Sequence, residues 1–180
     1  MSEPAGVEAE RRLVLAVALA QLADPFASAA LHEAAIDPIP EIRLVAQLGL
    51  ARIGDVGVAA LERRLIVEPD LGVFAVLAAR AGRLPIGTRA ITALGAQAAY
   101  VGTPGELRAG CAWAVAEHDE PRGGWLAGTL LADEEAAFWL ASIVARRGGV
   151  LVPLVAGLAA RPELDRVADL LAAGLGRASR

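Results

Sequence analysis

The sequence has no lysine, a single cysteine and few aromatic residues, which make up 4% of the chain. Because Cys111 is the one cysteine, an intrachain disulfide and a cysteine-based zinc site within one chain are both excluded. Apolar residues nevertheless make up 56% of the sequence, so the core must be built from alanine, leucine and valine. This alanine-rich composition favours closely packed helices.

Long hydrophobic runs are also missing, although the mean hydropathy is +0.49. The longest apolar runs, residues 13–20 and 148–160, are too short to span a bilayer, and each follows a pair of arginines. The amino terminus, MSEPAGVEAERR, is acidic before it becomes apolar, which is the wrong order for a secretory signal. We therefore expect a soluble, cytoplasmic protein without a membrane partner.

The charge balance is acidic, with a net charge of −4 and a sequence pI of about 5.2. No overall field therefore attracts nucleic acid or anionic lipid. Every basic side chain other than histidine is an arginine, which the coding bias of a GC-rich genome would explain. The alternative is that the forked arginine side chains act as hydrogen-bond donors at a binding face.

The most informative stretch is residues 37–55, DPIPEIRLVAQLGLARIGD. Pro38 and Pro40 predict a turn that leads into a helix, and Glu41 complements the positive end of the helix dipole. Gly54 is expected to end this helix and Asp55 to cap the next one. Apolar residues at three- and four-residue spacing predict one buried helix face, made of Ile42, Val45, Ala46, Gly49, Leu50 and Ile53.

This stretch resembles the HEAT-like repeat of phycobilisome-lyase-type proteins. Their pattern runs Asp-Pro-x-Pro-Glu-(Val/Ile)-Arg, followed by small apolar residues and Leu-Gly-x-Ile-Gly-Asp. One departure is Ala51, where the pattern usually has glycine. The positions that match are Asp37, Pro38, Pro40, Glu41, Ile42, Arg43, Ala46, Leu50, Ile53, Gly54 and Asp55. The resemblance implies an all-α, right-handed α-solenoid of antiparallel helix pairs, similar to HEAT and armadillo proteins.

The turn signals along the chain agree with such a repeat, because helix-ending residues recur at intervals near thirty. We expect a single domain over residues 1–180, with a capping helix at 7–22. Helix pairs are expected at about 25–54, 55–82, 84–118, 120–148 and 149–176. A compact orthogonal helix bundle is the alternative fold.

The residues suited to catalysis or metal binding do not form a convergent set. HEAT-like deoxyhypusine hydroxylases hold two irons with several His-Glu pairs, whereas this chain offers one, His32-Glu33. Cys111 and His118 are seven residues apart on a helix, which separates them by about 10 Å, too far for a nucleophile and its base. We therefore expect no metal and no cofactor, and a buried, structural Cys111.

All three tryptophans, Trp113, Trp125 and Trp139, fall close together in the sequence. They either fill the core or anchor a partner, since tryptophan and arginine dominate binding hot spots. HEAT-like DNA glycosylases use a basic, aromatic-lined concave face, so a small arginine-lined nucleic-acid binder is a minor alternative. The acidic balance of this chain argues against it, although arginines could cluster locally.

The resemblance also implies that the second helix of each pair lines a concave face. Candidate binding residues are Glu41, Arg43, Gln47, Arg108, Trp125, Glu135, Trp139 and Arg146. The leading hypothesis is a non-catalytic scaffold that binds another protein along this face. One alternative is a HEAT-like enzyme of the lyase or hydrolase type that uses carboxylates such as Glu41 or Glu135. Another is that a second copy of the chain fills the groove, because the composition favours exposed apolar surface.

Overall fold

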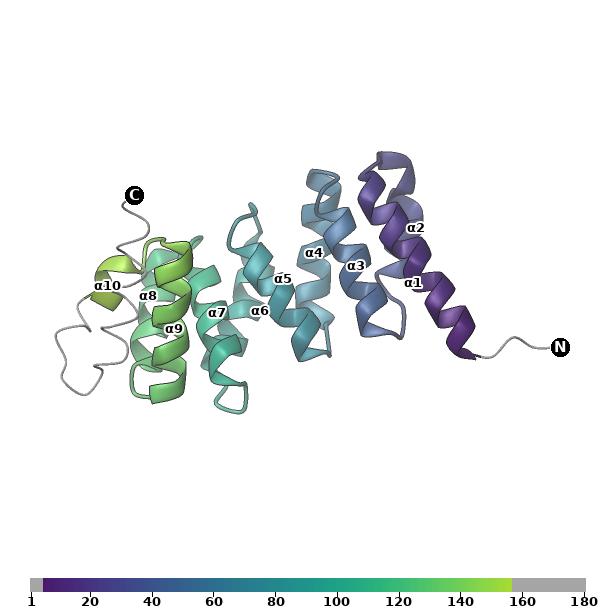
Figure 1. The fold of residues 1–180 in the computed structure, drawn as a ribbon. Coiled ribbons are helices and arrows are strands. Elements are labelled where there is room, and N and C mark those ends of the chain that lie inside the picture. Colours follow the sequence, from purple (N-terminus) through teal and green to yellow (C-terminus); the bar gives the residue numbers. More distant parts are fainter. Residues whose placement is uncertain (1–4, 157–180) are drawn as a thin grey trace. The chain divides into compact units, whose positions relative to one another are not determined.

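The computed structural model describes residues 5–156, and all regular structure in this range is helical (Figure 1). The prediction of an all-α fold is therefore confirmed. The helices are α1 (Ala5–Leu22), the 3-10 helix η1 (Pro25–Ala27), α2 (Ser28–Ala34), α3 (Pro40–Leu50), α4 (Asp55–Val67), α5 (Leu71–Ala81), α6 (Thr88–Ala99), α7 (Gly105–Ala116), α8 (Glu120–Leu130), α9 (Glu134–Arg147) and α10 (Val152–Ala156). Residues 157–176 of the helix pair expected at about 149–176 lie outside the described range.

Most helix boundaries follow the turn signals of the sequence. Asp119 and Asp133 cap α8 and α9 by accepting hydrogen bonds from backbone N–H groups. Asp55 does not cap α4, because Gly54 occupies the N-cap position and Asp55 begins the helix, so that prediction was wrong. Gly54 has a φ of +74°, a conformation that favours glycine. Within the described residues, no helix is both long and apolar enough to cross a membrane.

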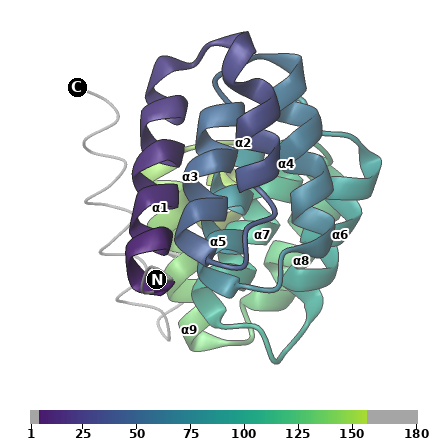
Figure 2. The ribbon, with the colours of Figure 1, turned by 90° about the vertical axis from the view of Figure 1, so that its right-hand side faces the viewer.

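The chain divides into two compact units, residues 1–77 and 78–180, with the boundary inside α5. In the first unit, α3 packs against α1, α2 and α4 (Figure 2). A Cβ atom on Gly49 would lie 2.7 Å from Ala20 of α1 and 3.3 Å from Leu31 of α2, so this glycine lets three helices approach closely. The centre of this core consists of Ala27, Leu31, Ala35, Ala46, Leu50 and Ala60.

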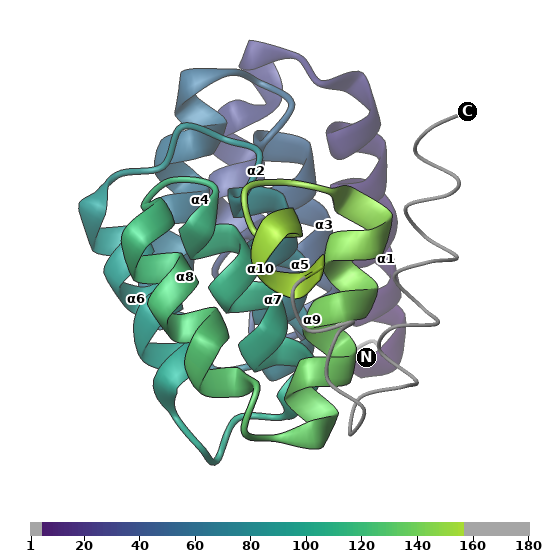
Figure 3. The same ribbon diagram turned by 90° about the vertical axis from the view of Figure 1, so that its left-hand side faces the viewer.

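In the second unit, α7 is the central helix and packs against α6, α8 and α9 (Figure 3). Most of its residues are buried, from Gly105 to Ala116, because neighbouring helices cover it on several sides. Gly123 of α8 lies against the backbone of Ala116, where a Cβ atom would overlap. The small side chains that dominate the composition thus allow close contact between helices.

Candidate functional site

Arg43 of α3 is buried and forms its hydrogen bonds within the first unit. Its side chain, predicted to line a binding face, is buried in the first unit and forms a two-pronged ion pair with Glu68, with N–O distances of 2.7 and 3.2 Å. Nη1 also donates to the backbone carbonyls of Asp37 and Pro38, at 2.9 and 3.0 Å. Because these bonds fix the guanidinium within the unit, Arg43 is no longer a candidate for partner binding.

Glu68 is the acceptor at the centre of this cluster. Burial by itself would raise the pKa of this carboxyl, but hydrogen bonds from Arg43 and Arg64 and from the backbone N–H of Asp70 outweigh it. The pKa of Glu68 is therefore lowered to about 2. A carboxylate that stays ionised in a buried position joins α3, α4 and the turn before α5.

Arg108 is likewise buried, and it holds together elements of the second unit. Its guanidinium donates to Asp133 at 2.8 Å and to the backbone carbonyl of Ala98 at 3.2 Å. Asp133 also caps α9 through the N–H of Ala136. Arg108 therefore stabilises the start of α9, and its proposed place on an open binding face is not supported by its burial.

The same spacing recurs in the ion pairs of both units. Within residues 5–156, three pairs join an arginine to a carboxylate 25 residues further along the chain. They are Arg12–Asp37, Arg43–Glu68 and Arg108–Asp133, at 2.7, 2.7 and 2.8 Å. The arginines come from α1, α3 and α7, the first two in the first unit and the third in the second unit. Sequence analysis missed this signal, although the separation of 25 is visible in the sequence once the arginines are compared.

Gln47 and Glu41 of α3 differ in their exposure. Gln47 is only 3% exposed and faces the interior, which removes it from the set of binding residues. Glu41 is exposed in the first turn of α3, where its charge complements the helix dipole. Of the three candidates on α3, Glu41 alone is accessible to a partner.

The candidates on α9 share one face of that helix. Trp139 and Arg146 follow Glu135 by four and eleven residues, which places all three within about 40° around the helix axis. Glu135 and Arg146 are exposed and Trp139 is partly exposed, whereas the opposite side of α9 is buried. We call Glu135, Trp139 and Arg146 the α9 stripe.

Local contacts hold the α9 stripe in position. The Trp139 ring meets the Phe138 ring edge-on, with 5.5 Å between their centroids. The Glu135 side chain lies beside Gly105, at the positive end of the α7 dipole. A Cβ atom added to Gly105 would lie 3.2 Å from the Glu135 side chain. Arg146 donates to the backbone carbonyl of Ser142. The stripe thus presents an acid, an aromatic ring and a base in order along one helix.

The other two tryptophans have different surroundings. Trp125 is 65% exposed, but it lies on α8 and is not part of the α9 stripe. Trp113 is buried in α7, and its indole N–H donates to the backbone carbonyl of Gly148 at 3.1 Å. The choice between core and surface is therefore answered residue by residue: Trp113 belongs to the core and Trp125 to the surface.

Trp113 also belongs to a cluster at the C-terminal end of α5 that sequence analysis missed. The Arg147 guanidinium lies 4.9 Å from the centre of the Trp113 ring and donates to the backbone carbonyl of Ala79 at 2.8 Å. Burial and the neighbouring Arg83 and Arg146 charges lower the pKa of Arg147. The cation sits at the negative end of a helix dipole, which favours its charge.

Neither histidine is brought to Cys111 or to a metal-type cluster. His118 donates from Nε2 to the backbone carbonyl of Ala81 at 2.9 Å. His32 Nδ1 lies 2.8 Å from the Ser28 carbonyl oxygen, and its Nε2 lies 3.3 Å from Nη2 of Arg63. Cys111 is buried, and burial raises the pKa of its thiol to about 12. Over residues 5–156, no three His, Cys, Asp or Glu side chains are grouped to hold a metal.

Comparison with models of known families, with curated proteins and with solved structures found no match to this chain.

Proposed function

We propose that this protein is a helical-repeat scaffold that binds another protein through the α9 stripe. The observation that carries the proposal is the alignment of Glu135, Trp139 and Arg146 on the accessible side of a helix whose other side is buried. Tryptophan and arginine are the residues most enriched in binding hot spots. A partly exposed indole between two opposite charges gives both area and orientation to a partner.

The order of charges along α9 specifies the chemistry of the partner. Glu135 lies at the first turn and Arg146 in the last turn, with Trp139 between them. A partner segment that crosses α9 would therefore carry a basic residue near Glu135, an apolar residue on Trp139 and an acidic residue near Arg146. Complementary charges of this kind fix register and speed association.

The repeat architecture that we propose is an α-solenoid of helix pairs. Support comes from the 25-residue spacing of the ion pairs, which recurs on α1, α3 and α7. The matched stretch at residues 37–55 supports it as well, since α3 buries the apolar face that the repeat pattern specifies. In such arrays the second helix of each pair, here including α9, forms the binding face.

The experiment is a comparison of Trp139→Ala with Trp125→Ala. The partner is first identified by affinity co-purification from the native host, and its affinity for the purified proteins is then measured by isothermal titration calorimetry. Trp139→Ala is expected to weaken binding about tenfold or more, because hot-spot tryptophans carry this much binding free energy. Trp125→Ala is the matched control, since it removes an exposed tryptophan from α8.

Circular dichroism of both variants is the control that checks that they remain folded. An equal affinity for the wild type and Trp139→Ala would contradict a binding role for the α9 stripe. Loss of binding in Trp125→Ala alone would move the site to α8.

A further inference from the structure

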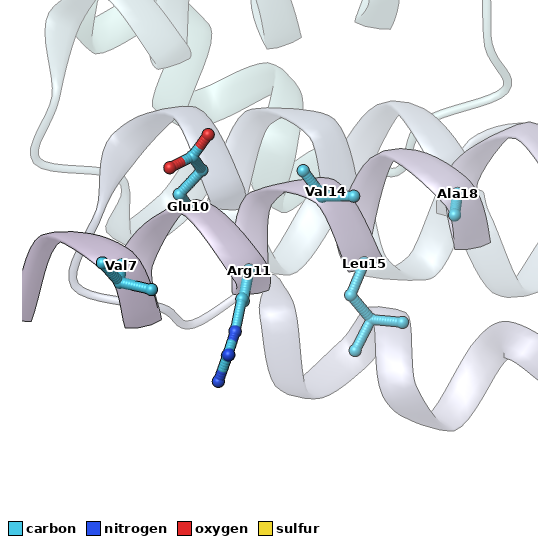
Figure 4. Close-up of a pocket in the computed structure, with 6 residues that line it drawn as sticks. All are labelled: Val7, Glu10, Arg11, Val14, Leu15 and Ala18. Carbon is cyan, nitrogen blue, oxygen red and sulfur yellow. The ribbon is translucent and has the colours of Figure 1, made fainter. Parts of the chain in front are cut away.

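The first unit has an open cavity of about 450 Å³ along α1 (Figure 4). Its lining consists of Val7, Glu10, Arg11, Val14, Leu15 and Ala18. Most of this lining is apolar, and its one acidic and one basic side chain do not select a particular partner. The second unit carries a surface of more specific chemistry, which is strongly cationic.

Three arginines gather at the C-terminal ends of α5 and α9 in the second unit. Arg146 and Arg147 belong to the last turn of α9, and Arg83 follows the end of α5 by two residues. The Arg147 guanidinium lies 4.9 Å from the centre of the Trp113 ring, and a Cβ atom on Gly82 would overlap the same ring. This shared ring brings the segment that contains Arg83 beside Arg147. We call Arg83, Arg146 and Arg147 the arginine cluster.

The charges of the arginine cluster are close enough to affect one another. Burial, and after it the charges of Arg83 and Arg146, lower the pKa of the Arg147 guanidinium. All three residues are nevertheless exposed to solvent. Like charges in such an arrangement repel one another, so an anion that binds beside them is attracted by all three at once.

Within residues 5–156, no carboxylate forms an ion pair with a member of the arginine cluster. The carboxylate of Glu117 lies beside Gly149, but it accepts a hydrogen bond from the backbone N–H of Val150 and not from an arginine. Other arginines of the chain do pair with an aspartate or a glutamate, namely Arg12, Arg43, Arg64 and Arg108. The cluster is therefore a set of cations without an internal counter-charge in this range.

Two guanidinium groups of the cluster are held in place and still have unused donors. Nη1 of Arg147 donates to the backbone carbonyl of Ala79 at 2.8 Å, and Nε of Arg146 donates to that of Ser142 at 3.1 Å. Their other side-chain nitrogens, and all those of Arg83, donate to no group among the described residues. Because a guanidinium presents its donors in a fixed fork that matches the two oxygens of a carboxylate, the cluster is suited to bind carboxylates.

We propose that the arginine cluster binds a run of acidic residues in the partner protein. The inference rests on the proposed function, since Arg146 belongs to both the α9 stripe and the cluster. It extends the acidic end of the partner segment from Arg146 to Arg147 and Arg83. An acidic segment fits better than a long nucleic acid, because the net charge of −4 repels an extended polyanion, whereas a short segment needs the local cluster alone.

The first experiment adds the full chain to a fluorescein-labelled hexaglutamate peptide at low salt and follows the fluorescence anisotropy. The wild type is expected to bind the peptide saturably, although both molecules are acidic overall. Arg83→Gln is expected to weaken this binding about threefold to fivefold, the effect of losing one exposed ion pair. Since the Arg83 side chain donates to no group among the described residues, this variant removes a charge and leaves the contacts of the fold intact.

Two further variants make the comparison specific. Arg147→Gln should weaken peptide binding about as much as Arg83→Gln, although it also removes the hydrogen bond to Ala79. Arg52→Gln is the matched control, because Arg52 of the first unit is exposed and likewise donates to a backbone carbonyl, that of Ala20. It changes the net charge by the same amount and is expected to bind the peptide as the wild type does.

The absence of saturable peptide binding by the wild type would overturn the proposal. Equal losses in Arg83→Gln and Arg52→Gln would overturn it as well, because binding would then depend on net charge alone. A hexapeptide of phosphoserine that binds when hexaglutamate does not would assign the cluster to a phosphorylated partner in place of an acidic one.

The second experiment measures the affinity of Arg83→Gln for the co-purified partner, alongside that of Trp139→Ala. Weaker binding by both variants is expected. Normal binding by Arg83→Gln together with weak binding by Trp139→Ala would reject the cluster and retain the α9 stripe. The opposite result would retain the cluster and reject the stripe, so the two proposals can fail separately.

Discussion

At the residue scale, the arginines act mainly as internal connectors. Arg43 and Arg108 each join a carboxylate 25 residues away to one or more backbone carbonyls. A guanidinium has five donors in a fixed fork, so one side chain can bind several acceptors from different segments at once. This explains how arginine can be buried in a small-residue core without leaving its charge unpaired.

The Glu68 cluster predicts an acid-sensitive contribution to stability. The pKa of Glu68 is lowered to about 2 in the folded protein, from an ordinary value of 4.5. A lowered pKa stabilises the fold above pH 4.5, and this contribution is lost as the pH falls toward 2. By linkage, the loss is on the order of 3 kcal/mol in the free energy of unfolding.

Glu68→Gln removes this titration. The variant is expected to be less stable at pH 7 because Arg43 and Arg64 lose a charged partner, and to lose less stability than the wild type between pH 4.5 and 2. Urea unfolding at several pH values measures both effects. Glu41→Gln, on the surface of α3, is the control and should retain the wild-type pH dependence. Parallel pH profiles for the wild type and Glu68→Gln would contradict the assignment.

Cys111 predicts a chemically silent thiol in the native protein. It is 0% exposed, and burial raises its pKa to about 12, so almost no thiolate is present at neutral pH. A thiol reagent such as DTNB should react slowly with the folded chain and at once in guanidinium chloride. Rapid reaction under native conditions would show that α7 opens or that the thiol is accessible.

The sequence predicted Cys111 correctly but misplaced Arg43, Gln47 and Arg108. Charged and polar residues are usually exposed, so a helical periodicity of apolar residues leaves them on the outer face by default. Their burial depends on partners far away in the chain, such as Asp133 for Arg108, which periodicity cannot identify. The 25-residue spacing was the one sequence feature that could have shown these pairs.

At the scale of helices, local signals were sufficient to find most elements. The helix pair expected at about 120–148 corresponds to α8 and α9, and Asp133, which precedes Glu134 and Glu135, is the N-cap of α9. The short helix η1 was not expected. Asp24 caps it and Pro25 begins it, so the chain forms a 3-10 turn before α2. Contacts between helices required tertiary information, as at the C-terminal end of α5, where Trp113 and Arg147 meet.

Two adjacent glycines of α8 give a matched test of helix packing. A Cβ atom on Gly123 would overlap the backbone of Ala116 in α7, whereas one on Gly124 would meet nothing within 4 Å. Gly123→Ala is therefore expected to destabilise the fold by about 1–3 kcal/mol. Gly124→Ala should stabilise it by about 0.5–1 kcal/mol, because alanine has the higher helix propensity.

Urea unfolding followed by circular dichroism measures both free energies. Since the two residues are neighbours in one helix, propensity affects them alike and packing alone separates them. Similar changes in the two variants would show that α8 does not pack closely on α7 at Gly123.

At the scale of the whole molecule, each unit has a central helix, α3 in the first and α7 in the second. Each of these helices carries a buried arginine near its start and small residues where neighbours approach. The same ion-pair spacing occurs on α1, where Arg12 pairs with Asp37 at 2.7 Å.

The whole-molecule charge predicts that the protein does not bind nucleic acid. The net charge is −4, and several arginines are already paired with carboxylates, including Arg12, Arg43 and Arg108. Binding to DNA draws most of its non-specific free energy from contacts between cations and phosphates. Fluorescence anisotropy with a labelled duplex at low salt should therefore show no saturable binding, and α9-stripe variants should not change this result. Saturable binding that weakens steeply with added salt would contradict the prediction, because such a salt dependence reports contacts with phosphates. An acidic chain could make these contacts through a local cluster of arginines, such as Arg83, Arg146 and Arg147.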